Sequence, residues 1–576
     1  MKKRTLIILL IYFTASSLLE LAAFKLGGTW SVAAAWLWLF TGLAVLGFFV
    51  FEILRMLFFD FKEKHFVTAL VFLAFIGVFV YHIASNEYSD INADAAQQLA
   101  AGLDSFKKAD LNYTGVAFLG YPNRQYVLAA LPALLFGRKI WTLHAGFGIL
   151  FIIGISYLYY ELRQWLKTKE MREEYALIPL FSFPVFNFIT EYYLNFEQAI
   201  TPVALSAILC ALYLRLMRKP DAVTFVMLSW AGCFTSGSYT PALALLGLLV
   251  AFLGLCAFEC IWNDSDDKEE KEGDDSLKWQ KPVLCLAVII NVSIVFLAGF
   301  ITGRADRIDQ FRNEGNLVKS AFKTWSDFFT DKNEIFLGVF WFIIIIYMIF
   351  ALLMRFTVRD FVIAVWVLGV VFMSEHMKGY TTYQKAWILQ RNMLIIPVLV
   401  TAIFIVCMNF LKKFSPGINL PLMVAILGAL AFLGIGNFGK QHRSFTYFRY
   451  VQPVKYLIED IYDSLEEYGL NERSEFAVVL YTDNHMQANL YDYAKFFFPN
   501  AVIYSESGTV YDNRIDASVI EGRTVFFYAE DERFDYLEPG TEDSAVYYSL
   551  LEKKNVQKKY KNKRYGVEHT WYHKVI

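Results

Sequence analysis

The chain has 576 residues, of which 56% are hydrophobic, and its formal net charge at pH 7 is −2. Soluble domains are about 45–50% apolar, and nucleic-acid-binding proteins carry a marked excess of basic residues. The composition therefore excludes an ordinary soluble protein and gives no reason to expect a nucleic-acid partner. The six cysteines all lie in apolar runs and lack the paired spacing of a zinc site.

Long apolar runs predict a polytopic α-helical membrane protein with about thirteen transmembrane helices. The first run follows a basic start, and a second run comes at once, so we interpret it as a retained helix and not as a cleaved signal peptide. The expected helices lie near residues 5–24, 31–58, 64–84, 140–161, 174–190, 198–217, 222–237, 240–262, 282–302, 335–354, 360–376, 392–411 and 418–437.

The pattern predicts three parts of the chain. Residues 1–60 hold two N-terminal transmembrane helices, residues 61–439 form a transmembrane core, and residues 440–576 form a polar C-terminal domain. Alternating strands and helices in the last part predict a small α/β domain, with strands at 475–481, 501–504 and 524–528 and a helix at 486–498. It contains no glycine-rich phosphate loop and no nucleophile elbow, so we expect recognition or support from it and not catalysis.

Basic residues in short loops predict the orientation, because cytoplasmic loops are enriched in Lys and Arg. Lys2, Lys3 and Arg4 place the N-terminus in the cytoplasm. The later basic loops, at 163–172, 215–219, 355–359 and 412–413, also fall inside if the short apolar segment 125–136 does not cross the membrane. We therefore predict that this segment is an interfacial helix on the outer surface. The loops at 85–137, 303–334 and 374–391 and the C-terminal domain then lie outside, and a bacterial plasma membrane is the expected location.

Two acidic residues open the loop 85–137. Asp90 follows the third predicted span, and Asp94 comes one helical turn later, on the same face of an expected amphipathic helix that reaches Leu103. Carboxylates spaced in this way can share a metal ion, or one can act as a base while the other orients it. The simpler alternatives are a solvated carboxylate at Asp90 and a favourable charge at a helix N-terminus at Asp94.

A third acid, Glu197, lies where one predicted helix ends outside and the next begins. An ionisable group at the edge of a membrane is a candidate for function, although a carboxylate ahead of Pro202 would also stabilise the start of a helix. We interpret Asp90, Glu197 and Asp94 as the candidate catalytic residues, with Asp90 and Glu197 as the ligands of a divalent metal ion, if one is bound.

The loop 374–391 carries basic residues on the outer side, against the usual distribution. They are His376, Lys378, Lys385 and Arg391, and aromatic residues lie between them. A phosphate or pyrophosphate near the interface would account for these cations, since Arg suits a bidentate contact with phosphate. We include Arg124, from the turn before the interfacial segment, among the candidate phosphate-binding residues. The simpler reading of the aromatic residues is an interfacial belt.

The order of these features resembles the C-type (GT-C) superfamily of integral-membrane glycosyltransferases, which includes the protein O-mannosyltransferases and the aminoarabinose transferase that acts on lipid A. Asp90 falls on the first acid of that family's external loop, and Glu197 on its second. The turn Gly120-Tyr121-Pro122, the closing Leu135-Phe136-Gly137 and the helix start from Arg391 to Pro397 match further short motifs. The pattern departs from the family at Ile91, where a second acid is often found, and at Ser236, where the family has Lys.

The resemblance implies transfer of a sugar from a polyprenyl-phosphate carrier to an acceptor hydroxyl on the outer face, with inversion expected. Asp90 would be the base, Glu197 and Asp94 would hold a metal or orient the acceptor, and Arg391 with Lys378 or Lys385 would bind the carrier phosphate. Membrane lipids and a glycan, lipid or protein acceptor are the implied partners. No cofactor other than a divalent metal ion is expected.

Two other classes of function stay open. Transporters and flippases of lipid-linked or anionic substrates place charged residues at mid-membrane, often in repeated halves. The chain has no clear repeat and its acids gather at loop edges, which favours an enzyme. The third class is a scaffold without catalysis, whose C-terminal domain binds a partner.

Overall fold

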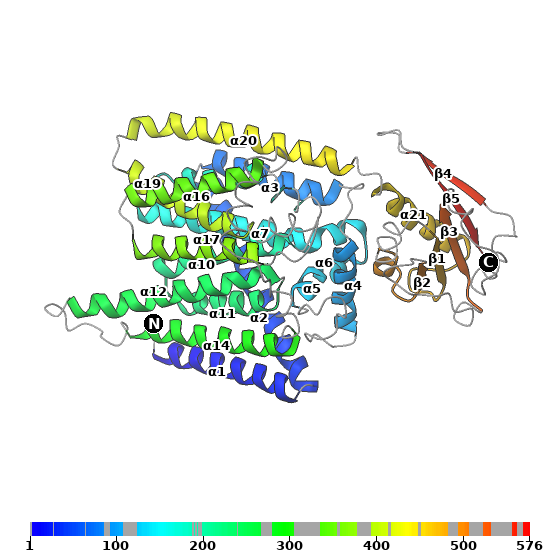
Figure 1. The fold of residues 1–576 in the computed structure, drawn as a ribbon, viewed down its shortest axis with the longest axis horizontal. Coiled ribbons are helices and arrows are strands. Elements are labelled where there is room, and N and C mark those ends of the chain that lie inside the picture. Colours follow the sequence, from blue (N-terminus) through cyan, green and yellow to red (C-terminus); the bar gives the residue numbers. More distant parts are fainter. Residues whose placement is uncertain are drawn as a thin grey trace.

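The computed structural model describes residues 3–26, 28–63, 65–85, 93–107, 124–186, 189–190, 193, 199–238, 240–266, 279–303, 335–353, 357–376, 393–412, 416–446, 451–481, 493–505, 522–530, 556–561 and 568–575. Up to residue 446 the described chain is mainly helical, and beyond residue 451 it contains a five-stranded sheet. Figure 1 shows the helical bundle and the sheet as separate parts of the molecule.

Long apolar helices make up the bundle. They are α1 (Lys3–Leu26), α2 (Gly28–Lys62), α3 (Phe66–Ser85), α7 (Ile140–Thr168), α10 (Ile200–Arg218), α11 (Ala222–Ser236), α12 (Ala244–Asp266), α14 (Gln280–Gly303), α16 (Ile335–Leu353), α17 (Val358–His376), α19 (Ile395–Leu411) and α20 (Pro416–Thr446). Within the described residues, seven helices are long and apolar enough to cross a membrane. The chain is therefore a polytopic helical membrane protein, and the total of about thirteen spans stays a prediction.

One predicted helix is wrong. The segment 174–190 is not a single helix but a series of short elements, η1 (Glu173–Ala176), α8 (Leu177–Ser182) and η2 (Phe183–Val185). Pro179 and Pro184 explain the interruption, because proline lacks the N–H of a helical hydrogen bond and its ring clashes with the preceding turn. The apolar composition of the segment is consistent with burial, but it does not specify a continuous helix.

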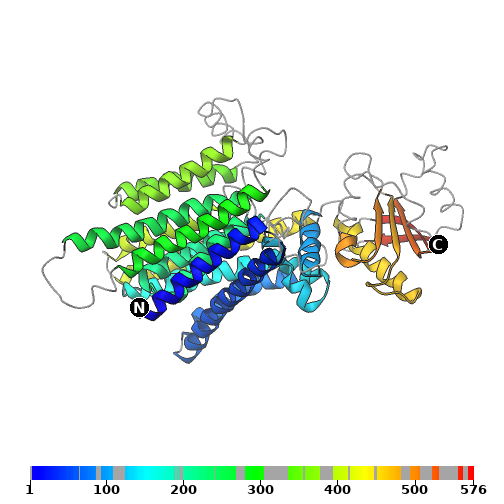
Figure 2. The ribbon, with the colours of Figure 1, turned by 90° about the horizontal axis from the view of Figure 1, so that it is seen from below.

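The two ends of the bundle differ in character (Figures 1 and 2). The short helices α4 (Ala93–Lys107), α5 (Arg124–Ala129) and α6 (Leu131–Phe136) lie at one end, between the bundle and the C-terminal part. We call this end the loop end and the opposite one the basic end. The basic residues that the sequence predicts on one side of the membrane gather at the basic end, where ion pairs join α2 to α7, α7 to α10, and α12 to α17.

Helices α7 and α10 form the centre of the bundle. Almost every residue of α10 is buried, and a glycine allows the closest approach of the two helices. A β-carbon at Gly154 would lie 2.8 Å from the carbonyl oxygen of Ala204. Only a residue without a side chain permits this contact, so Gly154 fixes how closely α7 packs on α10.

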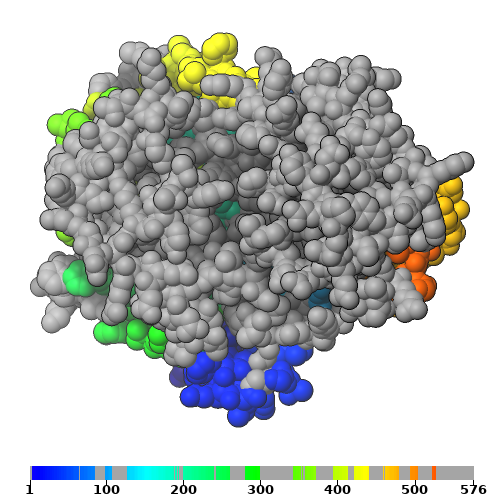
Figure 3. All heavy atoms as spheres, turned by 45° about the vertical axis from the view of Figure 1, so that its right-hand side comes forward, coloured from blue at the N-terminus to red at the C-terminus, as the bar shows by residue number. Residues whose placement is uncertain are grey.

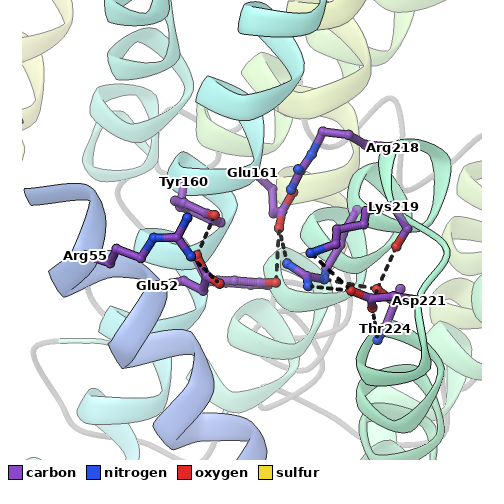
Figure 4. Close-up of polar contacts among 10 residues, drawn as sticks. Glu52, Arg55, Tyr160, Glu161, Arg218, Lys219, Asp221 and Thr224 are labelled. Carbon is purple, nitrogen blue, oxygen red and sulfur yellow. Dashed lines mark hydrogen bonds and ion pairs between the residues drawn. The ribbon is translucent and has the colours of Figure 1, made fainter. Parts of the chain in front are cut away.

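A buried ion pair joins the same two helices at the basic end (Figure 4). The Glu161 side chain of α7 is fully buried. Its carboxylate accepts hydrogen bonds from Arg218 at 2.8 Å, from Arg215 at 3.3 Å and from the Tyr157 hydroxyl at 3.1 Å. A buried carboxylate is stable only when charged or hydrogen-bonding partners compensate for its lost hydration. The partners from α10 provide this compensation.

A second cluster attaches α2 to α7. Arg163 of α7 donates two hydrogen bonds to Asp60 of α2, at 2.5 and 2.8 Å, and a third to Glu173 at 2.9 Å. One turn away, the Tyr160 hydroxyl donates to Glu52 at 2.6 Å. Paired guanidinium and carboxylate groups of this geometry are strong, charge-assisted contacts. They hold the second N-terminal helix against the core.

The C-terminal part contains α21 (Val451–Glu467) and a sheet of β1 (Ala477–Tyr481), β2 (Val502–Ser505), β3 (Val525–Glu530), β4 (Val556–Lys561) and β5 (Glu568–Val575). The strand order is β2-β1-β3-β5-β4. Strand β1 is parallel to β2 and β3, and β5 is antiparallel to β3 and β4. The three strands predicted from the sequence coincide with β1, β2 and β3, whereas β4 and β5 were not predicted. The domain boundaries at residues 60 and 439 stay predictions.

The ion pair of Glu161 generates a stability prediction. Glu161→Gln leaves Arg215 and Arg218 facing a neutral group in a buried site, and breaking a buried pair costs about 3–5 kcal/mol. We expect a clearly lower unfolding temperature for the detergent-solubilised variant. Lys167→Gln is the control, because the Lys167 side chain is 66% exposed and contacts its carboxylate partner only at 3.6 Å. Equal unfolding temperatures for the two variants would contradict the role given to Glu161.

Candidate functional site at the loop end

The helices of loop 85–137 pack tightly onto the start of α7. A β-carbon at Gly102 of α4 would lie 2.4 Å from the Tyr126 carbonyl oxygen and 2.9 Å from the Ala130 β-carbon. A β-carbon at Gly146 of α7 would lie 2.8 Å from the carbonyl oxygen of Ala129. Two glycines thus allow α4, α5 and α7 to approach to backbone contact. The described helices of the loop therefore pack directly on the bundle.

The predicted interfacial helix is two short helices, α5 and α6, that meet at Ala130. The end of α6 exposes apolar side chains, among them Leu135 at 71% and Phe136 at 60%, beside the half-exposed Trp141 of α7. Exposed Leu and Phe next to Trp at the end of a membrane bundle are typical of contact with the interfacial region of the lipid. The segment is therefore two short helices and not one. The prediction that it lies along the membrane surface is unchanged by this break.

The backbone conformation of Gly137 explains why the Leu-Phe-Gly sequence at the end of loop 85–137 closes with glycine. Gly137 has a φ of 87°, a conformation that residues with side chains rarely adopt. The buried Thr142 hydroxyl donates to the carbonyl oxygen of Gly137 at 2.8 Å, and the backbone N–H of Lys139 donates to the same hydroxyl at 2.9 Å. This turn reverses the chain from α6 into α7.

Asp90 and Glu197 themselves lie outside the described residues, but the chain near both belongs to the loop end. Asp90 stands between the end of α3, at Ser85, and the start of α4. Glu197 stands between Tyr193 and the start of α10 at Ile200. Asp94 is the second residue of α4, so its backbone is in the first turn of that helix.

Tyr193 brings these two stretches together. It is fully buried, and its hydroxyl donates a hydrogen bond to the carbonyl oxygen of Phe79 in α3 at 2.8 Å. Its ring packs against Phe79 and Phe151, with centroid distances of 4.9 and 5.4 Å. The segment that leads to Glu197 is thereby attached to the helix that leads to Asp90. Sequence reasoning did not identify Tyr193 as an anchor.

The candidate phosphate-binding residues lie at the margins of described segments. Arg391, Lys378 and Lys385 lie outside the described residues. His376 is the last residue of α17 and Arg124 is the first residue of α5. The chain just after Arg391 is attached to α10, because the buried Ser206 hydroxyl donates to the carbonyl oxygen of Leu394 at 2.6 Å.

Helix α10 begins immediately after the stretch that holds Glu197. Figure 3 shows the molecule from a side on which the described residues are visible only in part. The start of α10 therefore belongs to the same end of the bundle as the chain near the candidate acids.

The described residues add a polar group that the sequence analysis missed. Gln98 lies one turn after Asp94 on α4 and is 2% exposed. Its side-chain oxygen has no hydrogen-bond partner among the described residues. The i, i+4 spacing from Asp94 is the signal that would have identified it. His144 of α7, also 2% exposed, is a second buried polar residue near this end.

No group of three or more metal-ligating side chains occurs in the described parts of the chain. Because Asp90 and Glu197 lie outside those parts, the metal ligands predicted from the sequence are not tested by this result.

No protein-family model matches the chain, and no curated protein matches it. Among solved structures, the chain is similar to ArnT from Cupriavidus metallidurans bound to undecaprenyl phosphate, with 11% identity and a TM-score of 0.47 over 88% of this chain and 97% of that one. It is similar to the same protein in the apo state, with 11% identity and a TM-score of 0.47 over 89% and 98%. ArnT is an aminoarabinose transferase of the C-type superfamily that the sequence motifs resemble.

The contact at Gly102 predicts the outcome of a small substitution. Gly102→Ala places a methyl group 2.4 Å from the Tyr126 carbonyl oxygen, so α4 has to move away from α5. We expect faster amide hydrogen exchange in both helices. Gly77→Ala in α3 is the matched control, because a β-carbon there meets nothing within 4 Å. Unchanged exchange in α4 and α5 for Gly102→Ala would show that the two helices do not pack as described.

Proposed function

We propose that the protein is a membrane glycosyltransferase that moves a sugar from a polyprenyl-phosphate-linked donor to an acceptor hydroxyl at the loop end. The observation that carries the proposal is the meeting of three distant stretches of chain. Asp90 comes shortly after α3, Glu197 shortly before α10, and Arg391 shortly before α19. Tyr193, in the stretch before α10, is hydrogen-bonded to α3, and Ser206 of α10 is hydrogen-bonded to the residue before α19. A base, a second acid and a cation from these stretches form the set of groups that transfer from a phosphate leaving group requires.

In the proposed reaction Asp90 takes the proton of the acceptor hydroxyl. The acceptor oxygen attacks the anomeric carbon of the donor sugar, a new glycosidic bond forms, and the bond between that carbon and the phosphate oxygen breaks. The electron pair leaves with the polyprenyl phosphate. Arg391, with Lys378 or Lys385, stabilises the additional negative charge on the departing phosphate. Attack from the face opposite the leaving group inverts the anomeric centre.

Glu197 has one of two roles in this proposal. It orients the acceptor hydroxyl toward Asp90, or it holds a divalent metal ion together with Asp90. Carboxylate oxygens are the ligands that hard divalent cations prefer. Asp94 lies one turn before the buried Gln98 on α4. In this proposal it assists Glu197 in orienting the acceptor or holding the metal ion.

We further propose that the loop end faces the outside of a bacterial plasma membrane. The ends of α7 support this orientation: Lys167 and the ion pairs of Arg163 lie at the basic end, and cytoplasmic ends are enriched in such residues. With 29 residues, α7 has a length of about 44 Å, enough to cross a bilayer. The C-terminal domain then lies outside, on the same side as the proposed site.

Cysteine labelling at the two ends of α7 tests the orientation. Lys139 and Lys169 are both exposed and flank the same helix. In intact cells, we expect a membrane-impermeant maleimide to label Lys139→Cys, and to label Lys169→Cys only after the membrane is permeabilised. The unmodified chain, whose described cysteines lie within the bundle, gives the background. The reverse pattern would place the proposed site in the cytoplasm.

Substitution of Asp90 tests the chemistry. We expect Asp90→Asn to lower transfer from labelled polyprenyl-phosphate sugars in purified membranes by at least 100-fold, because general-base catalysis contributes about 10²–10⁴-fold. Asp110→Asn, an acid of the same loop without a role in the proposal, is the control. We expect Arg391→Ala to lower turnover and weaken donor binding together.

Equal product from the wild type and Asp90→Asn would contradict the assignment of the base. Donor binding without product from any sugar, combined with movement of the lipid across the bilayer, would favour a flippase instead.

A further inference from the structure

Arg138 connects the bundle to the C-terminal domain. It follows the Gly137 turn between α6 and α7, at the point where loop 85–137 ends. Its guanidinium Nη1 donates a hydrogen bond of 2.5 Å to the carbonyl oxygen of Phe496, a residue 358 positions later in the chain. Its Cζ also lies 5.9 Å from the centre of the Phe496 ring. One side chain thus contacts both the backbone and the ring of the same partner.

The Phe496 site belongs to the folded interior of the C-terminal domain. Phe496, Phe497 and Phe498 are all buried. The Phe498 ring packs on Tyr462 of α21 at 5.1 Å and on Phe476, just before β1, at 5.6 Å. Phe476 in turn packs on Phe526 of β3 at 5.4 Å. A residue bound to Phe496 is therefore bound to the aromatic core of the domain.

The ionisable groups around Arg138 come from both parts of the protein. Burial lowers the pKa of the Arg138 guanidinium, while Asp104 of α4 and Tyr462 of α21 oppose that effect. Burial, with Glu472, raises the pKa of Tyr462 to about 12, and Arg138 acts in the opposite direction. Arg138 stays charged at neutral pH and lies within electrostatic range of α4 on one side and α21 on the other.

We propose that Arg138 attaches the C-terminal domain to the loop end, and that this attachment holds α4 in place, because α4 packs through Gly102 on α5 and through Leu99 on the start of α7. The domain is then a partner of loop 85–137 and not an independent module on a tether. For the transfer reaction this makes Arg138 a positioning residue, because α4 begins three residues after Asp90. The docking stands on the contacts above; its effect on catalysis depends on the proposed function.

Hydrogen exchange of the full-length protein in lipid nanodiscs tests the docking without any activity assay. For Arg138→Ala we expect at least tenfold faster exchange in α4 and at residues 493–498. We expect no change in β5, which shows that the domain stays folded, and none in α10. Arg138→Lys keeps the charge and should restore part of the protection. Lys139→Ala, the removal of an exposed neighbouring cation, should leave exchange as in the wild type.

Unchanged exchange at α4 and 493–498 in Arg138→Ala would overturn the proposal. So would faster exchange of equal size in Lys139→Ala, because the effect would then be one of charge in general. If Arg138→Ala unfolds throughout, Arg138→Gln decides: local loss of protection at the same two segments supports the proposal, and wild-type exchange contradicts it. If exchange changes as expected but turnover does not, the docking holds and the effect on catalysis is absent.

Discussion

The packing of α7 against α10 is the constraint on which the other features depend. Gly154 lets the two helices touch, and the buried Glu161 binds Arg215 and Arg218 farther along the same pair. Breaking the contact is unfavourable, because it would leave the fully buried Glu161 carboxylate without its cationic partners. The other helices are arranged around this pair, and α2 is joined to it by the ion pair of Arg163 with Asp60.

Both helices of the pair start at the loop end, and this places the candidate chemistry. Helix α7 follows loop 85–137, and α10 follows the stretch that contains Glu197. Tyr193 then attaches that stretch to α3, and Ser206 attaches the start of α19 to α10. Described stretches of chain separated by up to about 300 positions, from α3 to the start of α19, are thus attached to one another at this end of the bundle. The proposed reaction requires groups held in place in this way, because transition-state stabilisation depends on preorganised charges.

The long helices could be predicted because a membrane span needs a continuous apolar run, which is visible in one sequence. The segment 174–190 has such a run but is broken, since Pro179 and Pro184 interrupt its hydrogen bonds. Strand β4 was missed because its sequence, VQKKYK, contains three lysines and carries no buried-strand signal. Strand β5 pairs with it and was missed as well.

The candidate site was only partly predictable, because some of its residues are visible in the sequence pattern and others act through contacts far away in the chain. Asp90, Asp94 and Glu197 could be selected because acids next to membrane spans are conspicuous in the sequence. Tyr193 and Arg138 could not be selected, since each acts on a backbone carbonyl far away in the chain, and a carbonyl has no sequence signature.

The central claim is that a polyprenyl phosphate binds at the loop end, among the stretches that hold Asp90, Glu197 and Arg391. Photo-crosslinking with a diazirine-bearing polyprenyl phosphate, followed by peptide mapping, tests it most directly. The account predicts labelled peptides from residues 86–124, 194–200 or 377–393, and loss of the label when unlabelled polyprenyl phosphate is added in excess. Competable labelling confined to the basic end, at residues 163–173 or 215–221, would contradict it.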